Sequence, residues 1–301
     1  MLGLVLLALV ATQAGSPDVS LDAILDRVSE EAEAFLNLAP KIIGRETLRQ
    51  RARQQPRRFR WRIGKSALEP PAVRYHEREI VSEYGFGTFQ EAPEALHEFR
   101  TVISVDGRNV AGQAQARETL TLGITSDDDR LKRKLLRQFE KHGLLAAAVD
   151  FGQLIVLFSR RQRAWYDFQV AGNQGIGAQQ ALVLAYRQLD GPGGFTIFEG
   201  NRAYQARLEG ELWVRETDFL PLRILVSGTV TDGKHQITHR GTVDYFRSAY
   251  GVLLPASVRY QKLMDDNLMV ESISSYTEFR MFAAEAEIRF ETAEPPAPAK
   301  K

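Results

Sequence analysis

Two histidines four residues apart, His235 and His239, are the first candidates for chemistry, because such a pair can hold a metal ion. The spacing suits a helix, but the surrounding residues are rich in Thr and poor in Leu, which favours a strand. On a strand the two imidazoles lie roughly 13 Å apart, too far to share one ion. Gln236 also stands where a zinc protease of the His-Glu-x-x-His type carries its Glu. We therefore predict no metal site at this pair.

Two further segments resemble ligand loops without meeting their requirements. Gly172 to Gly177 lacks the Gly-x-Gly-x-x-Gly spacing and the Lys-Ser/Thr pair of phosphate-binding loops, so we predict a hairpin connection. The acidic run Asp127 to Asp129 follows Ser126, and acids at this place stabilise the positive end of a helix. There is no Gly-x-Ser-x-Gly motif and no cysteine. The sequence predicts no catalytic residue, no cofactor and no enzyme activity.

The last candidates are arginines in a strand-like alternation, with Arg58, Arg60 and Arg62 on one face and Phe59, Trp61 and Ile63 on the other. An outward row of guanidinium groups attracts an anionic membrane surface or another acidic partner, at about 1 kcal/mol per basic residue near a charged membrane. The alternative is a solvated sheet face whose arginines pair across strands with Glu77, Glu79 or Glu83.

Charge and the first residues bear on partners and location. The chain has 301 residues, with 39 Lys+Arg against 38 Asp+Glu, and this balance argues against a nucleic-acid partner. Residues 1–11 form an apolar run too short to span a bilayer, followed by small residues up to Ala14. We expect a signal peptide over residues 1–15, cleaved near Ala14, and a periplasmic or secreted protein. A buried N-terminal helix is the alternative.

The clearest structural pattern runs from Arg207 to Asp232. Apolar residues and Gly alternate with polar ones from Leu208 to Val214, and the same period of two resumes from Leu222 to Val230. Pro221, which cannot donate to a ladder, suits the entrance of the second strand. We predict two half-buried antiparallel strands joined by a short loop.

Similar patterns surround this hairpin. A helix is predicted after the N-cap Ser20 and up to Pro40, and a helical insertion over about 113–143. Further strands are predicted over Val73–Phe86, His97–Val105, Leu154–Phe158, Ala164–Val170, Gln180–Leu189, Phe195–Glu199, Gln236–Ser248, Val252–Lys262 and Leu268–Phe282. The Pro-rich residues 294–301 are expected to be a disordered tail.

The segment G-E-L-W-V-R-E-T-D-F-L-P-L-R, residues 210–223, resembles the strand–turn–strand signature of the LolA/LolB-like superfamily of outer-membrane lipoprotein-sorting proteins. There a Gly-x-Leu-Trp-Val strand, a turn with Thr, Leu and Pro, and a strand with Arg recur. Arg215 departs from the pattern, since Asp is common at that place. The resemblance implies an incomplete β-barrel with helices over its mouth and acyl chains held in an apolar cavity.

We therefore predict an α+β fold with a single domain over residues 16–293. One large curved antiparallel sheet forms an incomplete β-barrel, with the N-terminal helix and the helical insertion packed on or over its concave face. The side chains predicted to line that face are Phe59, Trp61, Ile63, Tyr166, Phe168, Leu182, Leu184, Leu212, Val214, Ile224 and Val226.

Such a row either fills the barrel with side chains or encloses an apolar pocket, and the pattern alone does not choose between them. The resemblance favours the pocket. The predicted function is an exported, non-enzymatic carrier or sensor of a lipid or acylated lipoprotein. The alternative is a periplasmic interaction module with a filled barrel, whose basic strand, Arg51 to Arg62, docks an acidic partner.

Overall fold

The computed structural model describes residues 20–54, 73–144, 150–190, 195–199 and 202–282. The expected signal peptide, the expected tail and the predicted basic strand with Phe59, Trp61 and Ile63 lie outside these residues, so they stay predictions.

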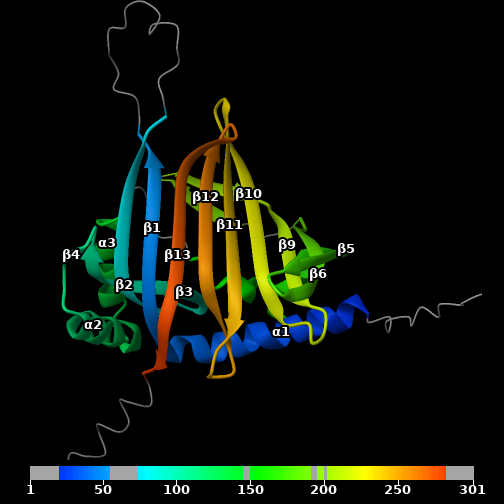
Figure 1. Ribbon diagram of the computed structural model, residues 1–301, viewed down its shortest axis with the longest axis horizontal. Helices are drawn as coiled ribbons and strands as arrows, with labels where there is room; N and C mark the ends of the chain where they lie inside the picture. The colour runs from blue at the N-terminus through cyan, green and yellow to red at the C-terminus, as the bar shows by residue number, and fades with distance from the viewer. Residues whose placement is uncertain (1–19, 55–72, 145–149, 191–194, 200–201, 283–301) are drawn as a thin grey trace, which may run out of the picture.

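Most of the described chain belongs to one open antiparallel sheet of eleven strands (Figure 1). Its order is β4-β3-β2-β1-β13-β12-β11-β10-β9-β6-β5. The strands are β1 (Ile42–Arg53), β2 (Tyr75–Phe89), β3 (Ala92–Val105), β4 (Arg108–Asn109), β5 (Tyr166–Ile176), β6 (Gln179–Gln188), β9 (Leu208–Arg215), β10 (Pro221–Asp232), β11 (His235–Arg247), β12 (Leu253–Met264) and β13 (Asn267–Met281). β7 (Phe195–Glu199) and β8 (Arg202–Ala206) form a separate pair. The predicted α+β class and large unclosed antiparallel sheet are confirmed.

The predicted hairpin forms β9 and β10, with one change of face. Leu212 pairs with Ile224, and both are fully buried on the face that we call concave, the one covered by the N-terminal helix. A register shift between Pro221 and Arg223 turns Leu222 to the opposite, convex face, where it packs with Trp213. The strict alternation predicted for Leu222 is therefore wrong, because a bulge adds one residue and reverses the side-chain direction.

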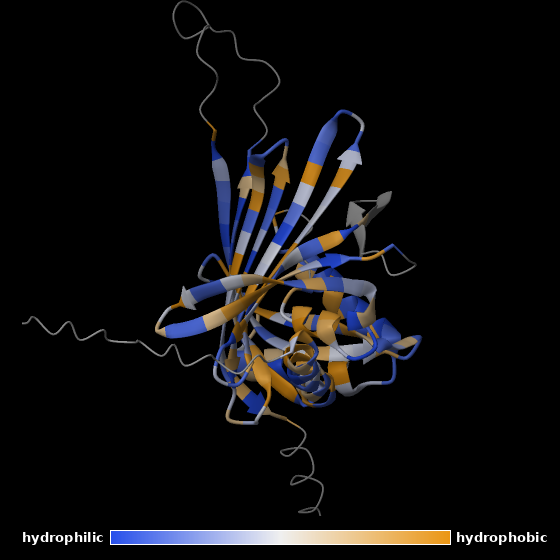
Figure 2. Ribbon diagram, turned by 90° about the vertical axis from the view of Figure 1, so that its right-hand side faces the viewer, coloured by the Kyte–Doolittle hydropathy of each residue, from blue (hydrophilic) through white to orange (hydrophobic). Residues whose placement is uncertain are grey.

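The N-terminal helix α1 (Leu21–Leu38) crosses the concave face at one end of the strands (Figure 1). Ser20 caps it as predicted, since its side chain accepts a hydrogen bond from the Ala23 amide. A short helical turn, η1 (Ala39–Lys41), with Pro40 near its start, then leads into β1. Seen from the side of the sheet, hydrophobic segments gather between α1 and the strands (Figure 2).

The helical insertion consists of α2 (Gln113–Thr125) and α3 (Asp129–Glu140), and it is divided between the two faces. α2 packs on the convex face, where Ile124 lies against Gly85 because that glycine has no side chain to obstruct it. α3 contributes Phe139 to a small cluster with Leu48 on the concave side. Asp128 caps α3 in place of the predicted Ser126, whose hydroxyl instead accepts from the Asp128 amide.

Three further segments differ from the predicted strands. Leu154–Phe158 is a 3₁₀ helix, η3, and not a strand. Gly172 to Ile176 continues β5 past a bulge at Gly172, so the predicted hairpin connection begins later. β1 was not predicted, because Glu46 and Gln50 stand in phase with its inward apolar residues and hide the alternation. A third helical turn, η4 (Arg163–Trp165), leads from η3 towards β5.

Candidate functional site

The described part of the predicted apolar row gathers on the concave face. Leu184, Leu212 and Ile224 are cross-strand neighbours on β6, β9 and β10, and each is fully buried. One apolar cluster contains every described member of the row: Tyr166, Phe168, Leu182, Leu184, Leu212, Val214, Ile224 and Val226. Of these, Phe168 and Leu182 are partly exposed. The sequence pattern therefore found a coherent surface on β5, β6, β9 and β10.

Two segments cover this surface. α1 contributes Val28 and Phe35, both fully buried in the same cluster. η3 lies alongside α1 and inserts Ile155 and Phe158, also fully buried. The ring of Phe158 lies 5.9 Å from that of Phe168, which places the apolar turn directly on the predicted lining. We call the segment Gly152–Phe158 the plug.

The concave interior is filled by these side chains. Two cavities lie there, each of about 20 Å³, which is the scale of a single water molecule. Pockets for drug-sized ligands measure about 300–1,000 Å³. Neither of these two cavities is large enough for an acyl chain, because the plug and α1 occupy the adjoining space between the curved strands. One of the two cavities touches the plug at Leu154 and Leu157 and is almost wholly apolar.

A few hydrogen bonds attach the plug to its surroundings. The hydroxyl of Tyr245 donates to the Gly152 carbonyl and accepts from the Ile155 amide, at 3.1 Å in each case. At the other end, the Ser29 hydroxyl of α1 donates to the Phe158 carbonyl at 2.8 Å. The side chains of η3 supply its further contacts with the apolar cluster.

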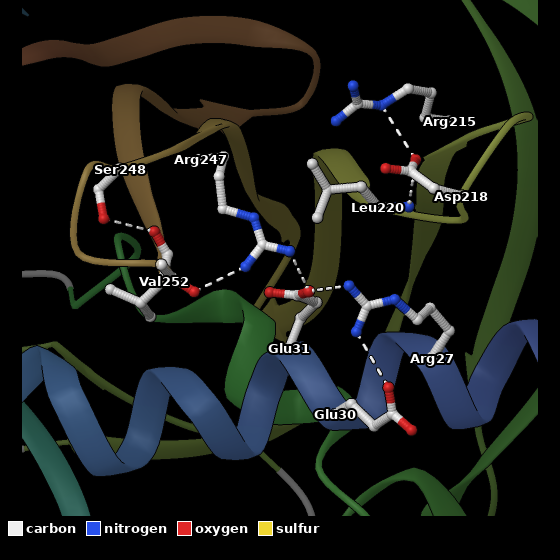
Figure 3. A network of polar contacts seen from close by, with 10 residues as sticks. Arg27, Glu30, Glu31, Arg215, Asp218, Leu220, Arg247, Ser248 and Val252 are labelled. Carbon is white, nitrogen blue, oxygen red and sulfur yellow. Dashed lines mark hydrogen bonds and ion pairs between the residues drawn. The ribbon is translucent and has the colours of Figure 1, made fainter.

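An ion-pair network ties α1 to the turn between β11 and β12 (Figure 3). Its centre is Glu31, 2% exposed, which accepts from Arg247 at 2.6 Å and also pairs with Arg27. Arg247 in turn donates to the Gly251 carbonyl at 2.7 Å. Arg27 also reaches the exposed Glu30 at 3.0 Å. The carboxylate of Glu31 therefore joins the covering helix to the sheet.

Charged residues are buried on the concave side of β1 and β3, and sequence analysis missed them. Arg100 donates to Glu46 at 2.6 and 3.2 Å and to Glu98 at 2.6 Å, and all three side chains are at most 6% exposed. Tyr276 donates to Glu46 at 3.0 Å. The signal was present in the sequence, because Glu46 stands in phase with Ile42 and Leu48 along β1.

Burial has a large effect on Glu98. Removal from water raises the pKa of Glu98 to about 8, against the lowering effect of Arg100, and the negative charges of Asp150 and Glu46 raise it further. At neutral pH the carboxyl group of Glu98 is therefore largely protonated, beside the Glu46–Arg100 ion pair.

The convex face carries polar grooves. One cavity of about 510 Å³ lies over β1, β2 and β13, and one of about 450 Å³ lies over β5, β6 and β9–β11. Arg49 of β1 pairs with Glu79 at 2.9 Å beside the first groove. Glu79 is one of the three acids that the alternative interpretation pairs with the arginines of residues 58–62; within the described residues its partner is Arg49 of β1.

The two histidines of β11, His235 and His239, contact different residues. His235 lies 2.6 Å from an Asp265 oxygen, and His239 lies 2.8 Å from the Tyr260 hydroxyl. Within the ranges that the structure describes, no group of three His, Asp or Glu side chains is placed to hold a metal ion. No described helix combines the length and apolar character needed to cross a membrane.

No family model and no curated protein matches this chain. Among solved structures, an outer membrane lipoprotein-sorting protein domain from Vibrio parahaemolyticus is similar at 11% identity and a TM-score of 0.38, over 86% of this chain and 92% of that one. A DUF1329 family protein from Desulfovibrio piger is similar at 10% identity and a TM-score of 0.33, over 90% of this chain and 97% of that one. MucB in complex with MucA(peri) follows at 13% identity and a TM-score of 0.18, over 84% and 98%.

The LolA/LolB-like resemblance rests on the β9–β10 motif, residues 210–223, and not on these likenesses. At such identities and TM-scores they carry no information on ligands, so the function has to be inferred from the side chains of this chain.

Proposed function

We propose that this protein is a non-enzymatic carrier or sensor that binds the acyl chain of a lipid or lipoprotein in its concave interior, with the plug as the segment that the ligand displaces. The observation that carries the proposal is the plug itself. Its apolar side chains Leu154, Ile155 and Phe158 are packed in the apolar cluster between α1 and the sheet. They cover the same surface that an acyl chain would need.

The exchange of plug for ligand is energetically reasonable. Each buried acyl methylene contributes about 0.8 kcal/mol, so a long chain replaces the apolar contacts of the plug without directional bonds. The hydrogen bonds given up belong to Tyr245 and Ser29, and each is worth about 1 kcal/mol net. α1 remains attached through Glu31, so the sheet keeps its cover while the plug leaves.

Location and donor surface belong to the same proposal. The apolar residues 1–11 and the small residues up to Ala14 are typical of a signal peptide for export. Mass spectrometry of the N-terminus of the mature protein tests whether this segment is cleaved. The arginines at positions 58, 60 and 62 would then meet an anionic membrane surface from which a lipid or lipoprotein is taken.

Weakening the plug tests the proposal. The double variant S29A/Y245F removes the hydroxyls that hold the plug at both ends, so it should bind a fluorescent fatty acid several-fold more tightly than the wild type. Y250F is the matched control, since the Tyr250 hydroxyl bonds the Phe279 carbonyl away from the plug. Native mass spectrometry of protein purified without detergent should show bound lipid. If neither a fatty acid nor its methyl ester binds to the wild type or to the double variant, the carrier is refuted.

The filled interior supports a second candidate, an interaction module whose ligand is another protein. In that case the plug is permanent core, and an acidic partner docks on the basic segment at 58–62. A pull-down that is sensitive to salt and lost on replacing Arg58, Arg60 and Arg62 by Ser, without any effect of lipid, would favour this module over the carrier.

A further inference from the structure

Several buried polar atoms on the concave face, Ser82 Oγ among them, lack a hydrogen-bond partner among the described residues. Two of them lie beside the plug: the hydroxyl of Tyr84 on β2 and Oε1 of Glu98 on β3. Buried polar groups are nearly always paired, and each exception costs about 1–3 kcal/mol. Two exceptions on neighbouring strands therefore require an explanation.

Both groups point at the start of the plug. A Cβ atom added to Gly152 would lie 2.6 Å from the Tyr84 hydroxyl and 2.9 Å from Glu98 Oε1. These are hydrogen-bond distances, so a ligand oxygen at that point would reach both groups at once. In the plugged state this point lies one bond length from the Cα of Gly152, so a ligand oxygen fits there only after the plug leaves, and glycine has no side chain to bond the two groups. The nearby cavity of about 20 Å³ is lined by Glu46 and Tyr276, and neither unpartnered group lines it.

The charges around this point decide which oxygen fits. The guanidinium group of Arg100 donates twice to Glu46 and once to Glu98 Oε2, so its charge is paired with these carboxyl groups. Burial raises the pKa of Glu98 to about 8, so at neutral pH its free oxygen, Oε1, is a hydroxyl donor. A neutral carbonyl oxygen accepts from both donors. A free carboxylate would instead bring a further negative charge beside Glu46 and find no unpaired cation in the described surroundings.

We propose that Tyr84 and Glu98 form a polar anchor for the carbonyl oxygen of an ester- or amide-linked acyl chain, and that they discriminate against free fatty acids. This inference rests on the proposed function, since the anchor becomes accessible only when the plug leaves. The hydrogen bonds missing in the plugged state are then made by the ligand, which favours the liganded state over the plugged one.

The test compares a dansyl-labelled fatty acid with its methyl ester at neutral pH. The wild type should bind the ester more tightly than the acid. Y84F should weaken ester binding about five- to ten-fold, the worth of one hydrogen bond, and leave acid binding unchanged. Its unfolding midpoint without ligand should not fall, because the lost hydroxyl has no partner there. A hydroxyl with a purely structural role would give the opposite pattern.

Two further variants complete the experiment. E98Q keeps a donor at Oε1 and should retain the preference for the ester. Y260F removes another hydroxyl of the concave face, one bonded to His239, and should leave that preference unchanged. Equal binding of acid and ester, unaltered by Y84F, overturns the anchor and leaves the carrier standing. If neither probe binds the wild type or S29A/Y245F, the carrier fails and the anchor with it.

Discussion

The buried carboxyl group of Glu98 contributes to the pH dependence of the stability of this fold. Its pKa is raised from 4.5 to about 8, with burial as the main cause. A raised pKa means that the folded state holds the proton more tightly than the unfolded state does. The resulting stabilisation is fully present below pH 4.5 and is lost as pH rises towards 8 and above.

We therefore predict that the free energy of unfolding of the wild type falls between pH 5 and pH 8, by an amount on the order of a few kcal/mol. E98Q, which cannot ionise, should lose most of this dependence. Urea unfolding at several pH values measures it, with E94Q as control because Glu94 is an exposed residue of the same strand. An unchanged pH slope in E98Q would show that another group is responsible.

Among the helices and strands, those with a regular alternation of apolar and polar residues were predicted from the sequence. α1 and the β9–β10 hairpin were found because their apolar residues keep one period and Ser20 and Pro221 mark the ends. β1 was missed because its inward face includes Glu46, whose partner Arg100 comes from a strand far along the chain. The apolar run of η3 has no period that separates a strand from a plug, and only tertiary contacts decide its conformation.

The bulge in β10 and the placement of α2 were hidden for a related reason. The residues around Leu222 give no sign of the bulge, although the extra residue in the bulge turns the Leu222 side chain to the other face of the sheet. α2 docks on the convex face because Gly85 leaves room for Ile124, and a glycine in one strand does not indicate which helix it receives. Local patterns identify the elements, while long-range complementarity places them.

The attachment of α1 leads to a prediction at the same scale. E31Q should destabilise the fold by about 1–3 kcal/mol, because Arg27 and Arg247 lose their shared buried carboxylate. E30Q is the matched control, since Glu30 is exposed and pairs with Arg27 alone. Hydrogen exchange of the α1 amides together with urea unfolding measures both variants. Equal effects of the two substitutions would mean that Glu31 does not hold the helix.

In the whole molecule, one open sheet supplies the buried core and also leaves two edge strands, β4 and β5. β1 pairs with β13, so the first and last strands lie side by side within the sheet, and β4 and β5 at its two edges do not pair with each other. β3 is flanked at one end by the short β4 and packs against α2 and α3. At the other end, the eleven residues of β5 pair with β6 alone. An unclosed sheet can widen around a ligand, but it also exposes backbone hydrogen-bonding groups.

We therefore expect copies of this protein to aggregate through pairing at the edge strand β5. Natural edge strands are commonly protected by Lys or Pro, and β5 has neither; its single charge is Asp167, and Val170 is 55% exposed. V170K should reduce concentration-dependent light scattering of the full chain, because a charge on the edge opposes strand pairing. The unfolding midpoint should stay nearly unchanged, since the side chain is largely in water. V73K introduces the same charge at a similarly exposed valine just before β2 and should leave scattering as in the wild type. Equal suppression by both variants would assign the effect to net charge and refute a role for the β5 edge.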